Sequence, residues 1–108
     1  MKAPHFNRKL VLEAPTRVSD GAGGFSEDWQ ALCIVWGEVL PRGAGREVEA
    51  SELKLKITVR AALQGAPSRP TAAMRFRDGD RLYRIEAVTE AEAAGRYLVC
   101  FAKEEVSA

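Results

Sequence analysis

The alternation of apolar and polar residues along the chain predicts a series of short β-strands. It is cleanest in the middle of the chain, where the apolar positions are Leu53, Leu55, Ile57 and Val59 and the polar ones are Lys54, Lys56, Thr58 and Arg60. A period of two is typical of a strand with one buried face and one exposed face. We therefore expect residues 53–60 to form a central strand.

The same pattern predicts strands at residues 7–14, 29–40, 74–77, 81–88 and 96–103. Pro15 should end the first of these strands. The second is apolar almost throughout, which is typical of a strand buried on both faces for part of its length. As an alternative, Ser26 or Asp28 caps a short helical turn before that strand begins. Residues 78–80 (Asp-Gly-Asp) favour a tight hairpin turn, because Asp-Gly tolerates positive φ angles.

Three polar or glycine-rich segments interrupt this pattern. Residues 19–28 are predicted to form a loop, which Phe25 pins to the body of the protein, and residues 64–71 a second loop. Residues 43–52, which follow Pro41, are predicted to form a loop that projects from the body, in which residues 46–52 either form about two turns of helix or stay irregular. The candidate contact residues in and beside this projecting loop are Arg42, Gly43, Gly45, Arg46, Glu47, Glu49 and Glu52.

Six strands with short connections and almost no helical periodicity predict an all-β fold. We expect a small antiparallel β-barrel or sandwich of about six strands with a long projecting loop, and one short helix as an option. The length of 108 residues fits a single domain over residues 1–108. The chain has no apolar run of the roughly 18 residues that a membrane span needs, and no secretory signal at its N-terminus, so we expect a cytoplasmic protein.

Charge gives no overall preference for a polyanion. The formal net charge is +1, from 16 basic and 15 acidic residues, so nothing draws the whole molecule to nucleic acid or to an anionic membrane. Basic residues dominate between positions 69 and 84, and acidic ones from position 86 onward. Such opposed clusters are typical of an ordinary mixed surface, but they are also candidates for contacts between copies of the chain: Arg75, Arg77, Arg84, Glu90 and Glu92.

Residues that carry chemistry are few. The two cysteines, Cys33 and Cys100, lie in predicted strands and are expected to be free thiols, and the only histidine is His5. A zinc site needs about four ligands, and a Ser or Cys nucleophile usually needs a histidine base, so we expect no metal, no cofactor and no enzyme activity. Asp78 and Asp80 flank a glycine and are interpreted as turn formers.

A nucleic-acid-binding barrel would place exposed aromatic rings among basic residues. The nearest candidates are Phe76, Tyr83 and Tyr97, which lie among arginines. We interpret these rings as core residues, since most aromatic side chains of a small barrel must lie inside it.

Several short motifs in a fixed order resemble one known family. They are V-W-G-E-V at residues 35–39, G-R-E at 45–47, I-T-V-R at 57–60 and L-Y-R-I-E-A-V at 82–88, with a D-G-D turn before the last. Over residues 7 to about 104 the chain resembles the head-tail joining proteins of long-tailed bacteriophages. These are also called head-tail adaptor or head closure (stopper) proteins, and phage-derived gene transfer agents have a counterpart.

The resemblance implies a structural protein of a virion or phage-like particle, assembled in the bacterial cytoplasm. Copies of the chain would form a ring between the portal and the tail, retain the packaged DNA and provide the platform on which the tail docks. Residues 43–52 would correspond to a family loop that projects toward the channel.

The implied partners are further copies of the chain, portal or adaptor proteins on the head side, and tail terminator or tail tube proteins on the tail side. DNA would pass through without sequence-specific binding, and no membrane is involved. The alternatives are a tail terminator or tail-completion protein and, third, a nucleic-acid-binding β-barrel.

Overall fold

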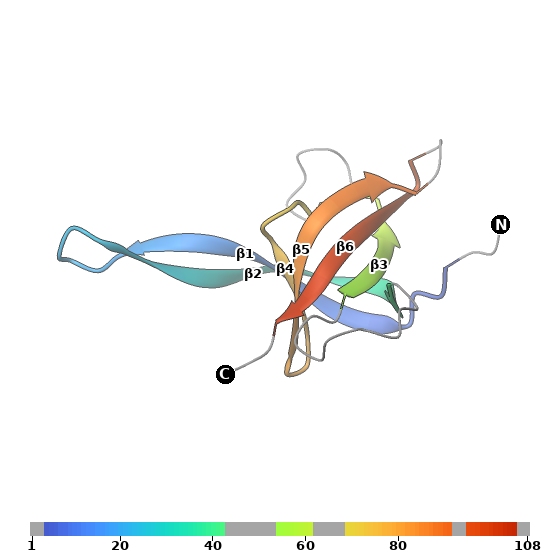
Figure 1. Ribbon diagram of the computed structural model, residues 1–108, viewed down its shortest axis with the longest axis horizontal. Helices are drawn as coiled ribbons and strands as arrows, with labels where there is room; N and C mark the ends of the chain where they lie inside the picture. Colours follow the sequence, from blue (N-terminus) through green and yellow to red (C-terminus); the bar gives the residue numbers. More distant parts are fainter. Residues whose placement is uncertain (1–3, 43–53, 62–68, 92–94, 106–108) are drawn as a thin grey trace.

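A computed structural model of the protein describes residues 4–42, 54–61, 69–91 and 95–105. These residues form six strands: β1 (Arg8–Ser19), β2 (Phe25–Pro41), β3 (Lys54–Arg60), β4 (Arg75–Asp78), β5 (Arg81–Glu90) and β6 (Tyr97–Glu105). All strand pairs are antiparallel, and the order β1-β2-β3-β6-β5-β4 closes into a barrel through the pairing of β4 with β1 (Figure 1). The predicted all-β fold is confirmed. The described residues contain no helix, and therefore none that could span a membrane.

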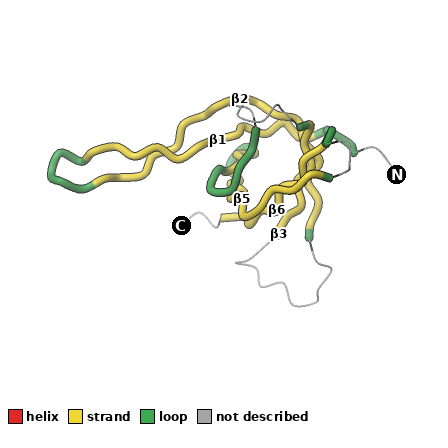
Figure 2. Tube along the Cα trace, turned by 90° about the horizontal axis from the view of Figure 1, so that it is seen from above, coloured by secondary structure: helices red, strands yellow, loops and turns green. Residues whose placement is uncertain are grey.

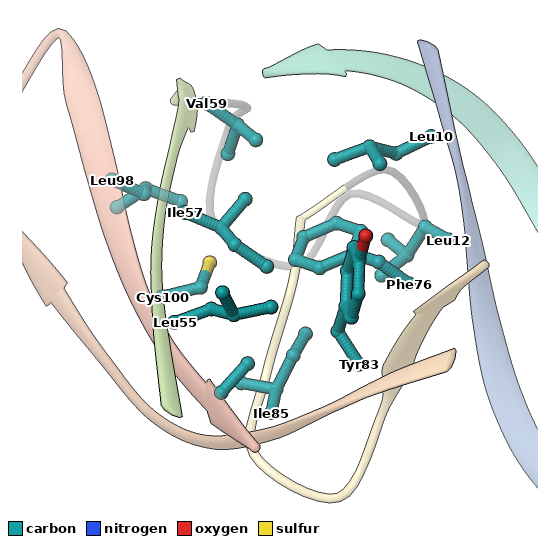
Figure 3. Packing of buried hydrophobic residues seen from close by; sticks show 11 residues of the cluster. Leu10, Leu12, Leu55, Ile57, Val59, Phe76, Tyr83, Ile85, Leu98 and Cys100 are labelled. Atoms are coloured by element: carbon teal, nitrogen blue, oxygen red, sulfur yellow. The ribbon is translucent and has the colours of Figure 1, made fainter. Parts of the chain in front are cut away.

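The barrel interior is filled by the apolar face of each strand. Leu55, Ile57 and Val59 of β3 are all buried, as the alternation predicts, and they face the rings of Phe76 and Tyr83 across the core (Figure 3). Leu98, Cys100 and Ala102 of β6 complete the same cluster. Removing these apolar side chains from water is the main stabilising contribution to such a fold.

The hairpin predicted around residues 78–80 is confirmed. Asp78 of β4 pairs with Arg81 of β5, so the turn consists of Gly79 and Asp80. Gly79 has a φ angle of +61°, which a residue with a side chain rarely adopts. This turn sets the register that brings Phe76 and Tyr83 side by side in the core.

The first hairpin is much longer than the sequence indicates. β1 runs through Pro15 to Ser19 and β2 begins at Phe25, so the predicted end at Pro15 is wrong and the loop is shorter than residues 19–28. Among the described strands, β1 pairs beyond Glu13 with β2 alone, and proline is tolerated in such an edge position because its missing N–H is not needed by a second neighbour. The predicted helical turn is also wrong, because Ser26 and Asp28 lie in β2.

Residues 14–30 therefore form a two-stranded extension, which we call the hairpin arm. It points away from the barrel and accounts for the elongated shape of the molecule, with extents of 54 × 37 × 22 Å (Figures 1 and 2). The arm begins at a shift in register, where Leu12 pairs with Cys33 but Glu13 pairs with Ala31. The extra residue in β2 is a β-bulge, which bends and twists a strand locally.

The arm ends in a compact turn. The Asp20 carboxylate accepts hydrogen bonds from the backbone N–H groups of Ala22 (2.8 Å) and Gly24 (3.0 Å), while Gly21 and Gly23 adopt positive φ angles. The sequence suggested that Phe25 pins this turn to the body, and that prediction is wrong. The Phe25 side chain is 65% exposed, with the Arg17 guanidinium 5.3 Å from the ring centroid.

The outer face of β2 is exposed, so the prediction of burial on both faces is also wrong. Trp36, Glu38 and Leu40 share this face, and Ile34 lies on it too. Trp36 is 54% exposed and Ile34 55%. We call Ile34, Trp36 and Leu40 the β2 patch.

Candidate functional site

The predicted projecting loop, residues 43–52, lies entirely outside the described residues. The candidate contact residues that the structure does not describe are therefore Gly43, Gly45, Arg46, Glu47, Glu49 and Glu52. Glu92, from the predicted charge cluster, also lies outside the described residues. Arg42, at the start of this segment, is described. Its backbone N–H donates to the Lys54 carbonyl (2.9 Å), and its guanidinium lies 5.0 Å from the centroid of the Phe101 ring and 3.9 Å from Glu86 Oε1. The two strands that flank the loop are thus joined at its base.

The structure brings the three arginines of the predicted charge cluster together at the base of the hairpin arm. Arg75 and Arg77 flank the inward-facing Phe76 of β4 and point outward, where Glu13 of β1 lies between them. Arg75 Nε donates to Glu13 Oε1 (2.6 Å), and Arg77 Nη2 donates to Glu13 Oε2. Glu13 is only 2% exposed, because these arginine side chains cover it.

Trp29 of the arm completes this cluster. The Arg75 guanidinium lies 4.1 Å from the Trp29 ring centroid, and that of Arg84, from β5, lies 5.8 Å from it. Cation–π contacts of this kind contribute roughly 0.5–2 kcal/mol, more where water is excluded. We call Glu13, Trp29, Arg75, Arg77 and Arg84 the arm-base cluster. It ties the arm to strands β4 and β5, and sequence reasoning missed the parts of Glu13 and Trp29 in it.

The side chains of the cluster differ in how exposed they are, and so in how accessible they are to another molecule. Arg75 has a side chain only 12% exposed and is committed to Glu13 and Trp29, whereas the side chains of Arg77 and Arg84 are each 48% exposed. Glu90 is exposed at the far end of β5 and does not join them. The predicted use of these charges between copies of the chain stays a prediction.

A second polar network lies at the β4–β5 turn. Asp78 accepts hydrogen bonds from the buried Tyr83 hydroxyl (2.8 Å) and from Arg8 Nη2. Burial raises the pKa of Asp78, but the hydrogen bonds from Arg8 and Tyr83 outweigh it and hold the pKa below its usual value. Burial, together with the bond to Asp78, raises the pKa of Tyr83 to about 12. Asp78 is therefore more than a turn former, since it links β1, β4 and β5.

A small hollow adjoins the β2 patch. It has a volume of about 260 Å³ and is lined by Phe6, Val35, Trp36 and Arg60. The Phe6 ring contacts Tyr97, with ring centroids 5.7 Å apart, and the Arg60 guanidinium lies 5.6 Å from the Phe6 centroid. This volume is below the roughly 300–1,000 Å³ of typical small-molecule pockets, and it suits one large side chain better.

Comparison with known proteins gives the chain its family. A family model described as phage head completion protein matches residues 1–105. The chain belongs to the phage head completion protein family. No curated protein matches the chain.

Two solved structures resemble this head completion protein over its full length. A chain in the structure of the virion of a native gene transfer agent particle is 49% identical, with a TM-score of 0.80, over 98% of this chain and 100% of that one. The solution structure of protein SF1141 from Shigella flexneri 2a is 16% identical, with a TM-score of 0.72, over 100% of both chains. The second likeness shows the fold alone.

Membership of this family indicates a structural role in completing the head of a phage or phage-like particle, which argues against an enzyme. Within the described residues no group of three or more His, Cys, Asp or Glu side chains is placed to hold a metal ion. Cys33 and Cys100 are free thiols, as predicted, and burial raises the pKa of Cys100 to about 12. Phe76 and Tyr83 are fully buried, so their rings are not available to stack on bases. Tyr97 is only partly buried and does not belong to the core cluster, so its predicted place in the core is wrong.

Proposed function

We propose that this head completion protein is a head-tail connector. Copies of the chain form a ring between the portal complex and the tail, help retain packaged DNA and give the tail a docking platform. The observation that carries the proposal is the 49% identity, over nearly the whole chain, to a chain of a native gene transfer agent virion. In that setting the portal or an adaptor lies on the head side, and a tail terminator or tail tube protein on the tail side.

Two features of the fold support assembly into a ring. A ring of identical copies needs two different surfaces that meet head to tail. The chain offers a projecting hairpin arm at one end of β1 and β2, and the exposed β2 patch near the other. Arg77 and Arg84 add half-exposed positive charge at the base of the arm.

Residues 43–52 are proposed to project from the barrel toward the channel. The supporting observations are their position between β2 and β3 and the fixed ends of those strands, where the Arg42 N–H donates to the Lys54 carbonyl. DNA would pass this loop without sequence-specific contacts, consistent with the net charge of +1.

The test of the connector role is electron microscopy of particles from a producing strain that lacks this gene, alongside the complemented strain. We expect separate heads and separate finished tails, restored to whole particles by complementation. Normal particles in the deletion strain would overturn the proposal. Unfinished tails beside closed heads would move the role to the tail side, as for a tail terminator.

Deleting residues 43–52 tests the loop. The barrel should still fold, because the core cluster lies in the described strands, but particles should not be completed. Circular dichroism of the purified variant measures whether the barrel folds. Assays of DNA transfer by the particles, or counts of whole particles by microscopy, measure whether particles are completed. If the variant unfolded, the segment would belong to the core and the assignment as a projecting loop would be wrong.

A further inference from the structure

Two exposed apolar features of the chain lie at opposite ends of one strand. Phe25 projects at the tip of the hairpin arm, and Trp36 borders the hollow that Phe6 and Arg60 also line. Both residues belong to β2, and at about 3.3 Å per residue they are about 35 Å apart along it. Because the strand is continuous, Phe25 and the hollow cannot meet within one chain.

We propose that Phe25 of one copy occupies the Phe6–Trp36 hollow of the next copy in the ring. This inference rests on the proposed connector function and names the contact that would join neighbouring copies. The hollow suits a phenylalanine ring by size and by chemistry. Two aromatic side chains line it, and aromatic pairs favour tilted or offset contacts. The Arg60 guanidinium already makes a cation–π contact with the Phe6 ring, and it could make a second one with the Phe25 ring of the other copy.

The charges around the two features are complementary. Residues 16–28 of the arm carry three acidic side chains, Asp20, Glu27 and Asp28, against one basic side chain, Arg17. Around the hollow basic residues outnumber acidic ones: Arg60 lines it and two lysines lie nearby, against Glu38 on the same face of β2. Lys9 pairs across the sheet with Trp36, and Lys56 pairs with Leu40, so both lysines lie on the same face as the β2 patch. An acidic arm tip and a basic rim favour the same orientation of the contact.

A second copy of this chain is the occupant that these observations favour. Every copy carries one arm and one hollow, so the contact between them is heterologous and repeats from each copy to the next. Such a contact closes into a ring when the rotation between copies closes. Burial of the Phe25 ring would stabilise the contact, and the charges around it would fix the orientation of one copy relative to the next.

Photo-crosslinking in assembled particles tests this contact. The complemented strain carries p-benzoylphenylalanine in place of Phe25, particles are purified and irradiated, and crosslinked peptides are identified by mass spectrometry. We expect a dimer of this chain linked between position 25 and the peptides that contain Phe6 or Trp36. A matched control places the probe at Gln30, which is exposed in the same strand on the opposite face from Phe25, and it should not give that product.

Other outcomes decide against the inference. A crosslink from position 25 to a different particle protein, to another part of this chain, or to nothing would overturn it while leaving the connector function standing. If the Phe25 probe is not incorporated, the probe is placed at Phe6, where only a crosslink to the arm of another copy supports the contact. Normal particles in the deletion strain would instead reject the connector function itself.

Substitutions give a second readout. Phe25→Ala and Trp36→Ala should each lower the yield of joined particles about tenfold, as expected for loss of one aromatic anchor from an interface. Phe25→Tyr keeps the ring and should retain most of the yield. The double variant should be no worse than either single variant, because both remove the same contact. Additive losses would contradict the pairing of these two residues.

Discussion

The barrel and the hairpin arm are built from the same two strands, yet they depend on different interactions. Inside the barrel, β1 and β2 gain a second neighbour each, and β1 buries Leu10 and Leu12 completely. In the arm the same strands have no other partner among the strands that the structure describes, and Val18 and Phe25 are exposed. The barrel is thus stabilised by burial of apolar side chains, and the arm by its backbone ladder and by the cluster at its base.

This difference separates folding from assembly. A two-stranded ribbon alone is marginal in water, so the arm depends on the barrel for its existence and returns little stability to it. Its side chains are therefore available for contacts with other molecules. Substitutions in the two regions should show the contrast directly.

The largest difference in stability is expected between Phe→Ala in the core and the same substitution at the arm tip. Phe76→Ala removes a fully buried ring from the core and should lower the free energy of unfolding by about 3–5 kcal/mol. Phe25→Ala, at the arm tip, should change it by less than about 0.5 kcal/mol. Urea denaturation followed by circular dichroism measures both. Equal losses would show that the arm tip is part of the folding core.

The arm-base cluster should come next. Glu13→Gln leaves Arg75, which is largely buried, without its carboxylate partner and should cost about 3 kcal/mol. Glu105→Gln is the matched control, since Glu105 Oε1 lies 3.8 Å from the half-exposed Arg84 and such surface pairs contribute about 0–1 kcal/mol. A small loss for Glu13→Gln would mean that Arg75 finds another acceptor.

The Asp78 network makes stability depend on pH. Since the pKa of Asp78 is lower in the folded protein than in the unfolded chain, its contribution is present above the unfolded value near pH 3.9 and is lost as the pH falls through the folded value. Asp78→Asn should cost about 2 kcal/mol at neutral pH and flatten the loss of stability below about pH 4. Tyr83→Phe removes one hydrogen-bond donor to Asp78 and should lower the dependence of the unfolding free energy on pH by a smaller amount. Urea denaturation at a series of pH values measures this dependence. If both variants lost stability below about pH 4 as the unsubstituted protein does, the role assigned to Asp78 would be wrong.

Within the arm-base cluster, a smaller effect on stability is expected at Trp29 than at Glu13. Trp29→Ala removes the ring contacted by Arg75 and Arg84 and should cost about 1 kcal/mol. Hydrogen exchange provides the more informative measurement. Amides of residues 14–30 should exchange faster, while those of β3 and β6 should be unchanged. Faster exchange throughout the barrel would show that the arm is not an independent unit.

Sequence alone predicted the parts of the fold that bury apolar side chains. The alternation of Leu55, Ile57 and Val59 gave β3 and its inner face, and the Asp-Gly pair gave the β4–β5 turn. The arm was missed because its strands bury no apolar face, so the polar residues 16–28 show no useful alternation. Pro15 added a misleading stop, because proline breaks a central strand but not one with a free side.

The candidate surfaces were harder to predict, because they depend on residues distant in sequence. The pattern predicted a strand over residues 7–14, but a local pattern cannot show that two arginines of another strand would bind Glu13. The hollow likewise joins Phe6, Trp36 and Arg60 from three separate segments. Phe25 was expected to pin the loop to the body, but its side chain is 65% exposed.

The two-stranded construction of the arm has a consequence for the protein before it is assembled. A closed barrel leaves no unpaired strand edge, whereas each strand of the arm has one side whose N–H and C=O groups have no ladder partner among the described strands. Such edges promote aggregation, and natural proteins protect them with proline and charge. Pro15, Arg17 and Glu27 lie along these edges, so they would keep free subunits from pairing edge to edge before a particle takes them up.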